Sequence, residues 1–196
     1  MSHYFTYDPS LKSNIRTISY KICDKNIALQ SDSGVFSNKE IDKGSLIFIN
    51  ELIDKNLFGK VLDLGCGYGA IGISLSLIYG TKIEVSYADI NPKCIELTSR
   101  NLSQYDLNGT CTLSDGYENL SENYDFIVFN PPISVGKEKI FKIYEDSVSH
   151  LNDNGRLYLV IRKDKGALSH IKYLSTLFKN VEIIHKEKGY FIIECY

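Results

Sequence analysis

The sequence predicts an α/β protein with a doubly wound, mostly parallel sheet and helices on both of its faces. Two observations predict this class. From Lys60 onward, short apolar runs alternate with helical stretches, a pattern that builds a parallel sheet through right-handed crossovers. The last two apolar runs are separated only by residues 186–189, too few for a crossover, so these two strands are antiparallel neighbours.

The N-terminal part of the chain has a different pattern. Residues 15–22 and 26–30 predict two short strands around a polar turn, and residues 46–53 predict a helix from apolar positions three and four apart. We therefore expect residues 1–45 to be an extension with short strands. It would pack on a main domain of residues 46–196, and the two would form one structural unit.

The main domain contains the alternating elements. Helices are expected over residues 70–78, 92–105, 138–150 and 166–179, the second of them opened by a proline, and a turn is expected at 152–155. Strands are expected over residues 61–64, 82–88, 110–113, 124–129, 156–161, 181–185 and 190–196.

The composition is typical of a globular protein but does not indicate which molecule the protein binds. Of the 196 residues, 43% are hydrophobic and 23% are charged, as in ordinary globular proteins. No apolar run reaches the ~20 residues that cross a membrane, and no signal peptide is recognisable. The five cysteines are scattered and have no histidine near them, which predicts neither disulfides nor a metal site and suits the cytoplasm. A net charge of −2 does not by itself indicate a nucleic-acid partner.

A glycine-rich segment, Asp63 to Gly72, follows the first strand of the main domain and opens a helix. Glycines let the backbone approach a ligand closely, and the helix N-terminus offers free N–H groups. The spacing Gly67-x-Gly69-x-x-Gly72 also fits a dinucleotide site, or a tight strand-to-helix turn with no ligand. We favour a nucleoside-cofactor site, for which the sequence offers Asp63, Gly65, Cys66, Gly67, Tyr68 and Gly69.

Two aspartates follow the next strands in the way a nucleoside site requires. Asp89 ends the second strand, where a carboxylate can accept hydrogen bonds from both ribose hydroxyls, and Ile90 follows it. Asp115 follows the third strand and can accept a hydrogen bond from the adenine amino group. The alternatives are a helix cap for Asp89 and an ordinary turn for Asp115.

The segment Asn130-Pro-Pro-Ile133 after the fourth strand is the sharpest signal. Two prolines cannot donate to a sheet and they fix the backbone. Such a rigid loop would hold the Asn130 side-chain oxygen and the Pro131 carbonyl toward one point, where they suit an –NH2 group. The alternative is a strand-ending turn. We expect Asn130, Pro131, Pro132 and Ile133 to be the catalytic loop, with Asn130 also among the residues around the cofactor.

With these motifs the sequence resembles the small-domain methyltransferase family around the 16S ribosomal RNA guanine-N2 methyltransferase (RsmC), in particular its short single-domain relatives. The resemblance covers nearly the whole chain and includes Gly34-Val-Phe-Ser37, Asp42-x-Gly-Ser45, Asp63 to Gly72, Asp89, Asn130 to Ile133 and Leu151-x-x-x-Gly155. It implies a Rossmann-like class I methyltransferase fold with strand order 3-2-1-4-5-7-6 and strand seven antiparallel. It also implies S-adenosylmethionine as cofactor and S-adenosylhomocysteine as product.

The sequence departs from this family in two ways. The longer ribosomal enzyme carries a second, degenerate domain ahead of the catalytic one, where this chain has a short N-terminal piece. The residue after Asn-Pro-Pro is often aromatic in amino-methylating enzymes, whereas here it is Ile133. Phe36 could supply the missing aromatic face for a base, or it could be a core residue.

Basic residues fall in the loops that follow the fourth and fifth strands. Ligands of open α/β sheets bind at these carboxyl ends, so the basic residues could form a phosphate-binding rim or simply be solvated lysines. The residues concerned are Lys137, Lys139, Arg162, Lys163 and Lys165.

The sequence therefore predicts an S-adenosylmethionine-dependent N-methyltransferase, most simply one acting on guanine N2 of ribosomal RNA or of the small ribosomal subunit. Other acceptors remain open: DNA adenine, a protein glutamine or a small molecule. An NAD-dependent reductase would need a tyrosine–lysine or similar pair, which is not recognisable. A non-catalytic RNA-binding protein would have a decayed cofactor motif. Neither a metal nor a membrane is expected as a partner, and the oligomeric state is left open.

Overall fold

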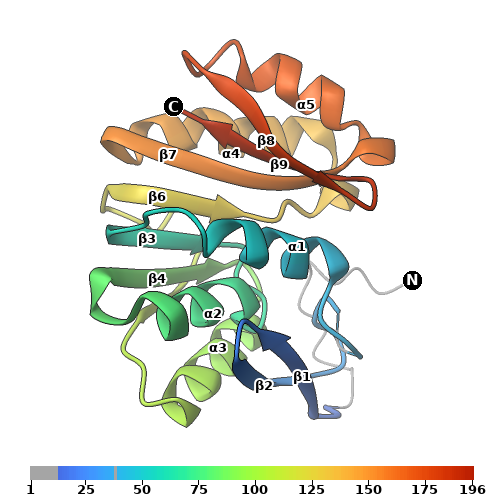
Figure 1. The fold of residues 1–196 in the computed structure, drawn as a ribbon, viewed down its shortest axis with the longest axis vertical. Coiled ribbons are helices and arrows are strands. Elements are labelled where there is room, and N and C mark those ends of the chain that lie inside the picture. The colour runs from blue at the N-terminus through green and yellow to red at the C-terminus, as the bar shows by residue number, and fades with distance from the viewer. Residues whose placement is uncertain (1–12, 38) are drawn as a thin grey trace.

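The computed structural model describes residues 13–37 and 39–196, so the first twelve residues of the predicted extension lie outside the described residues. Its main sheet has the order β5-β4-β3-β6-β7-β9-β8 (Figure 1). Only β9 runs against its neighbours β7 and β8, which confirms the predicted strand order with its reversed last strand. The strands are β3 (Gly59–Leu64), β4 (Ile83–Asp89), β5 (Thr110–Leu113), β6 (Tyr124–Phe129), β7 (Leu151–Arg162), β8 (Val181–Glu187) and β9 (Tyr190–Cys195).

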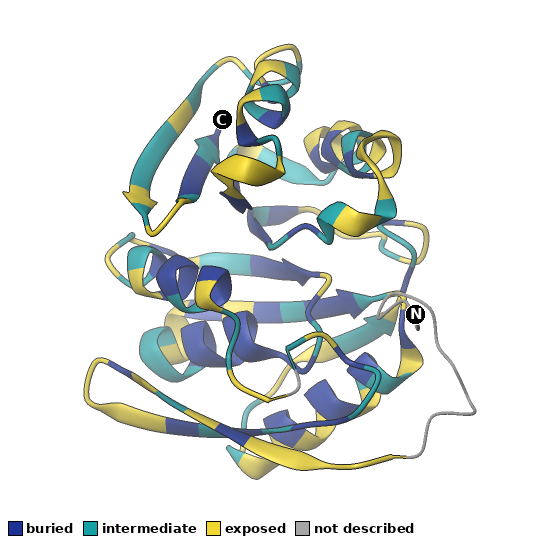
Figure 2. Cartoon of the chain, turned by 90° about the vertical axis from the view of Figure 1, so that its right-hand side faces the viewer, coloured by how far each residue is buried: buried dark blue, intermediate teal, exposed yellow. Residues whose placement is uncertain are grey.

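Helices cover both faces of the sheet, as predicted. Successive apolar side chains of a strand point to opposite faces, so each face of the sheet is apolar and packs against helices. Val61 and Val128 point into a core with the helices of one face, and Leu62 and Ile127 into a core with those of the other. These strands are the dark blue centre of Figure 2. The first face carries α1 (Lys43–Leu52), α2 (Ala70–Tyr79) and α3 (Pro92–Gln104), and the second carries α4 (Lys137–Ser149) and α5 (Ala167–Leu174).

The two predicted N-terminal strands form a separate antiparallel hairpin of β1 (Arg16–Ile22) and β2 (Lys25–Ser31). The hairpin lies beside α2 and α3 in Figure 1. Its alternate residues Ile18, Ile22 and Leu29 are buried in the same core as α1, α2 and α3. The hairpin is therefore built into the face of the main domain that carries these helices.

The helix predicted over residues 46–53 begins already at Lys43, and two other predicted elements differ more in their limits. Residues 152–155 were expected to be a turn, but they belong to β7 as an irregularity, because Tyr124 pairs with Leu151 and Phe126 already with Arg156. The helix expected over 166–179 ends at Leu174. Ser175 and Thr176 donate their side-chain hydroxyls back to the carbonyls of residues 171 and 173, and such bonds compete with helix continuation.

Three short 3₁₀ segments complete the chain: η1 (Gly80–Lys82), η2 (Ile133–Val135) and η3 (Lys163–Lys165). η3 follows β7 directly, and η2 follows β6 after residues 130–132, so these two segments shape the loops at the carboxyl ends of these strands. Within the described residues no helix is long and apolar enough to cross a membrane.

Candidate functional site

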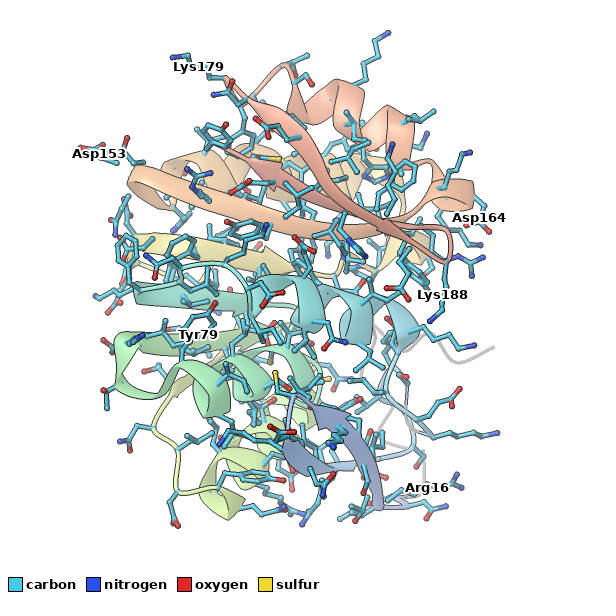
Figure 3. All side chains as sticks on the ribbon, in the orientation of Figure 1. Arg16, Tyr79, Asp153, Asp164, Lys179 and Lys188 are labelled. Carbon is cyan, nitrogen blue, oxygen red and sulfur yellow. The ribbon has the colours of Figure 1, made fainter. Side chains whose placement is uncertain are left out.

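A cavity of about 860 Å³ opens where the parallel strands β3, β4, β6 and β7 end. This is the place where open α/β sheets bind ligands, because the loops there diverge on either side of the sheet. Asp164 and Lys188 mark this end of the sheet in Figure 3, and Asp153 and Lys179 mark the opposite end. Within residues 13–37 and 39–196 no cluster of His, Cys, Asp and Glu side chains is arranged to hold a metal ion.

The glycine loop between β3 and α2 forms one wall of the cavity. Gly65, Gly67 and Gly69 all have positive φ angles, of 67°, 60° and 86°, a region that glycine enters without steric cost. A Cβ placed on Gly67 would meet no atom within 4 Å. The loop therefore leaves open space beside its backbone at this residue, as a ligand that approaches the backbone requires.

Asp89 joins this loop to the end of β4. Its carboxylate accepts one hydrogen bond from the Gly67 N–H at 2.9 Å and one from the Asn91 N–H at 2.8 Å. Burial raises the pKa of Asp89 above its ordinary value, although these backbone donors act in the opposite direction. Asp89 and Ile90 line the cavity, so a carboxylate lies on the cavity wall at the end of β4.

Asp63 does not line the cavity and in this differs from the sequence-based expectation. It is 1% exposed beneath the loop, and one carboxyl oxygen accepts the Gly72 N–H at 2.8 Å. The other oxygen has no hydrogen-bond partner. Burial, with a smaller contribution from the charge of Asp89, raises the pKa of Asp63 to about 7. Its visible role is to hold the start of α2 against β3.

The N-terminal hairpin braces the glycine loop from outside. Asn101 of α3 is fully buried. Its side-chain nitrogen donates to the carbonyls of Gln30 and Tyr68, at 2.9 and 2.8 Å, and its side-chain oxygen accepts the Gln30 N–H at 2.8 Å. Tyr20 of β1 donates to the Ala70 carbonyl at the start of α2, at 3.2 Å. The hairpin thus helps to fix the loop that lines the cavity.

Asn130 follows β6 and is held in one orientation by two contacts. Its side-chain nitrogen donates to a carboxyl oxygen of Asp42 at 3.2 Å and to the Ser45 hydroxyl at 2.9 Å. Asp42 also caps α1 by accepting the Ser45 N–H at 2.8 Å. Because both amide donors are engaged, the Asn130 oxygen is left as an acceptor in a residue that lines the cavity.

Aromatic and apolar side chains surround Asn130. Phe36 is 46% exposed and lines the cavity together with Pro131, Pro132 and Ile133. Tyr190, from the reversed strand β9, lines it as well. The exposed fraction of Phe36 excludes the alternative prediction that it is a buried core residue.

Tyr190 reaches the cavity because Gly44 makes room for its ring. A Cβ on Gly44 would come within 2.6 Å of the Tyr190 ring and within 2.9 Å of the Asp42 carboxylate. Three roles therefore meet in the segment Asp42-x-Gly-Ser45. Asp42 caps α1, Gly44 leaves space for the Tyr190 ring, and Asp42 and Ser45 accept the hydrogen bonds of the Asn130 amide.

The predicted basic rim is only partly free. Lys139 lines the cavity but pairs with Asp115 at 2.7 Å, so a phosphate contact and an adenine contact predicted separately are joined in one ion pair. Arg162 binds Asp164 through two nitrogens, at 3.0 and 2.7 Å, and lies over the Tyr190 ring at 5.7 Å. Lys165 lines the cavity as well.

Most of the predicted site residues thus meet at one cavity. Asp63, Gly69, Lys137 and Lys163 do not line it: Asp63 lies beneath the glycine loop, Gly69 is the last loop residue before α2, and the two lysines are exposed. Sequence reasoning gave no role to Asp42, Ser45 or Tyr190, which line the cavity. A signal was available for the first two in the Asp42-x-Gly-Ser45 segment, but none was available for Tyr190.

Comparison with known proteins identifies the family. The sequence profile of the family described as methyltransferase small domain matches residues 26–194. An uncharacterized protein, YbxB of Bacillus subtilis, is 40% identical over 195 residues, which are 98% of this chain and 96% of that protein. Ribosomal RNA small subunit methyltransferase C of Actinobacillus pleuropneumoniae is 38% identical over 148 residues, 72% of this chain and 44% of that protein. The chain thus spans less than half of the length of this ribosomal RNA methyltransferase.

A solved structure with the same fold is that of the T. thermophilus 16S rRNA N2 G1207 methyltransferase (RsmC) in complex with AdoMet and guanosine. It has a TM-score of 0.83 and 25% sequence identity, over 95% of this chain and 52% of that one. The fold, the cavity with its glycine loop and the family profile agree. The chain belongs to the methyltransferase small domain family and is an enzyme that uses S-adenosylmethionine.

Proposed function

We propose that the enzyme transfers a methyl group to the N2 amino group of a guanine in ribosomal RNA. We also propose that it acts in the cytoplasm. The observation that carries this proposal is the fixed orientation of Asn130. Asp42 and Ser45 hold its amide nitrogen, so its oxygen is available to accept a hydrogen bond from a substrate –NH2 group. Among possible acceptors, an exocyclic amino group of a base meets this requirement.

Open space beside the glycine loop and two carboxylate acceptors on the cavity wall suit S-adenosylmethionine. The space beside Gly67 accommodates a ligand against the backbone, and the Asp89 carboxylate suits the two ribose hydroxyls. Asp115 lies where it can accept a hydrogen bond from adenine once its pairing with Lys139 is exchanged. We assign cofactor contacts to Gly65, Cys66, Gly67, Tyr68, Asp89, Ile90 and Asp115, and indirect support of the loop to Asp63 and Gly69.

When bound, the cofactor supplies a methyl group on a positively charged sulfur. The protein's own residues mainly position the amine. The Asn130 oxygen and the Pro131 carbonyl accept its two hydrogens and so aim the nitrogen lone pair. Pro131 and Pro132 keep this loop rigid, and Ile133 and Phe36 press on the base. The amine proton leaves to water after transfer, and no strong general base is required.

The relatives support RNA as the substrate. Two proteins similar to this chain carry names that state ribosomal RNA methylation, and one of them was solved with guanosine. The exposed basic residues Lys163 and Lys165 belong to η3, of which Lys165 lines the cavity, and they suit phosphate contacts.

The test is transfer of a labelled methyl group from S-adenosylmethionine to the RNA, DNA, protein and small-molecule fractions of a strain that lacks the gene, followed by nucleoside analysis and mapping of the labelled RNA. The proposal predicts label in N2-methylguanosine of the small-subunit RNA, either as free RNA or in the assembled subunit. Label in 6-methyladenine of DNA, in protein glutamine or in a small molecule would replace the proposed acceptor with that one.

A further inference from the structure

The Asp42 carboxylate has one oxygen that the protein does not use. One oxygen accepts the Ser45 N–H and the Asn130 side-chain nitrogen. No group in the described part of the chain donates to the other oxygen, and no lysine or arginine there forms an ion pair with Asp42. Asp42 is only partly buried and lines the cavity together with Asn130, so its carboxylate offers an acceptor on the cavity wall.

Two acceptors on neighbouring residues select for two neighbouring donors. The Asn130 oxygen suits one N–H, and the unused Asp42 oxygen suits a second N–H close by, since a carboxylate is acceptor-only when ionised. A ligand atom with a lone pair at the second position would face the carboxylate and be repelled. Asn130 and Asp42 together therefore favour an amino group whose neighbouring ring or chain atom is a hydrogen-bond donor, and disfavour one whose neighbour is an acceptor.

The possible acceptors differ in this respect. Guanine carries its N2 amino group next to N1–H, so its Watson–Crick edge presents donors side by side. Adenine carries its N6 amino group next to N1, which is an acceptor, and a glutamine amide carries its nitrogen next to a carbonyl. Recognition of unstacked bases through this edge is usual for RNA-binding proteins.

We propose that the Asp42 carboxylate accepts a hydrogen bond from N1–H of the target guanine and thereby selects guanine over adenine. The proposal rests on the proposed function and names the residue that sets its base selectivity. Asp42 then has two roles: one oxygen orients Asn130, and the other reads the base.

The substitution Asp42→Asn separates these roles. Asparagine caps helices as well as aspartate does, and its oxygen can still accept from the Ser45 N–H and the Asn130 nitrogen. Its nitrogen then takes the place of the unused carboxyl oxygen, so the cavity-facing group changes from acceptor to donor. Ser45→Ala is the matched control, because it removes one partner of Asn130 and leaves the Asp42 carboxylate in place.

The experiment measures binding of guanosine and of 2-aminopurine riboside, up to millimolar concentration, to the protein loaded with S-adenosylhomocysteine. 2-Aminopurine carries the same amino group, but its N1 has no hydrogen. Wild type should bind guanosine tighter by about tenfold or more, the effect of one charge-assisted hydrogen bond. Asp42→Asn should reduce or reverse this ratio, because an amide nitrogen can donate to N1 of 2-aminopurine. Ser45→Ala should weaken both ligands and keep the ratio.

Three results would overturn the proposal in distinguishable ways. An unchanged ratio in Asp42→Asn would show that Asp42 does not read N1. An unchanged ratio together with loss of S-adenosylhomocysteine affinity would assign the carboxylate to the cofactor's ammonium group instead. Failure of wild type to bind either nucleoside, or to methylate guanine in RNA, would remove the proposed function itself and this inference with it.

Discussion

Two aspartates near the carboxyl ends of β3 and β4 show how position decides the role of a residue. Asp89 lines the cavity and accepts two backbone N–H groups, whereas Asp63 lies beneath the glycine loop with one oxygen unpaired. The pKa of both carboxyl groups is raised, chiefly by burial. Only Asp89 is placed to meet a ligand, so substitutions at the two positions should affect different properties.

Asp89→Ala should weaken binding of S-adenosylhomocysteine by roughly 1.5–3 kcal/mol, the value of a hydrogen bond to a charged group. Part of the loss could come from the loop, because Asp89 also holds the Gly67 N–H. Thr98→Val is the control, since it removes the hydroxyl that donates to the Gly67 carbonyl at 3.0 Å and leaves the carboxylate. Calorimetry should show a small loss for the control, and equal affinity in Asp89→Ala and wild type would exclude a ribose contact.

Asp63 should make stability depend on pH. Its pKa is 3.8 ordinarily and about 7 in the folded protein, so the folded state holds this proton more firmly than the unfolded state. Its favourable contribution is complete below about pH 4 and is lost as pH rises to about 7. The free energy of unfolding of wild type, relative to Asp63→Asn, should fall across this range in urea titrations. A constant difference between the two proteins would contradict the raised pKa.

At the scale of elements, the N-terminal hairpin and α3 act as a brace for the glycine loop. Asn101 provides three hydrogen bonds within this brace while fully buried. Asn101→Ala would leave the Gln30 N–H and two carbonyls without partners. It should lower the free energy of unfolding by about 3 kcal/mol, the cost of unpaired buried polar groups.

The control for this substitution is Gln104→Ala, which removes an exposed hydrogen bond to the Ala28 carbonyl of the same hairpin. It should cost less than about 1 kcal/mol, as surface changes usually do. Similar losses for the two variants in urea unfolding would show that the buried connection does not stabilise the molecule as described.

Local patterns were enough to predict the sheet, since each strand and its crossover are encoded by neighbouring residues. The Asn-Pro-Pro loop and Asp89 were predictable for the same reason: their position at a strand end is a local property. The partners of Asn130 were not predictable, because Asp42 lies 88 residues away in the chain. Tyr190 reaches the cavity because β9 is reversed and because Gly44 leaves space for its ring. These are long-range contacts, which the spacing of apolar residues in the sequence does not predict.

For the whole molecule, a net charge of −2 means that RNA must be attracted by a local surface. Arg162 is neutralised by Asp164, so Lys163 and Lys165 should carry the phosphate contacts of the β7 loop. Lys163→Ala with Lys165→Ala should flatten the log–log salt dependence of RNA affinity by about 1.4 units, or 0.7 per contact with a single strand. Arg162→Ala alone should change it little.

The charge-matched control is Lys82→Ala with Lys179→Ala. Lys82 precedes β4 and Lys179 lies at the opposite end of the sheet from Asp164 and Lys188 (Figure 3). RNA affinity should be measured across a salt series with S-adenosylhomocysteine present. The same flattening in both double variants would mean that RNA responds to net charge and does not contact the β7 loop.

In the proposed mechanism Asn130 presents its oxygen to the substrate amine, and the substitution Asn130→Ala removes this acceptor. The comparison uses methyl transfer to RNA by wild type, Asn130→Ala and Ser45→Ala, with calorimetry of S-adenosylhomocysteine for each. Asn130→Ala should lower kcat and kcat/KM together by a factor of ~100 or more, as expected for one positioned polar group that acts in the transition state. Its affinity for S-adenosylhomocysteine should stay near that of wild type, and Ser45→Ala should lose less activity. Transfer by Asn130→Ala at a near wild-type rate would show that the Asn130 oxygen does not orient the amine.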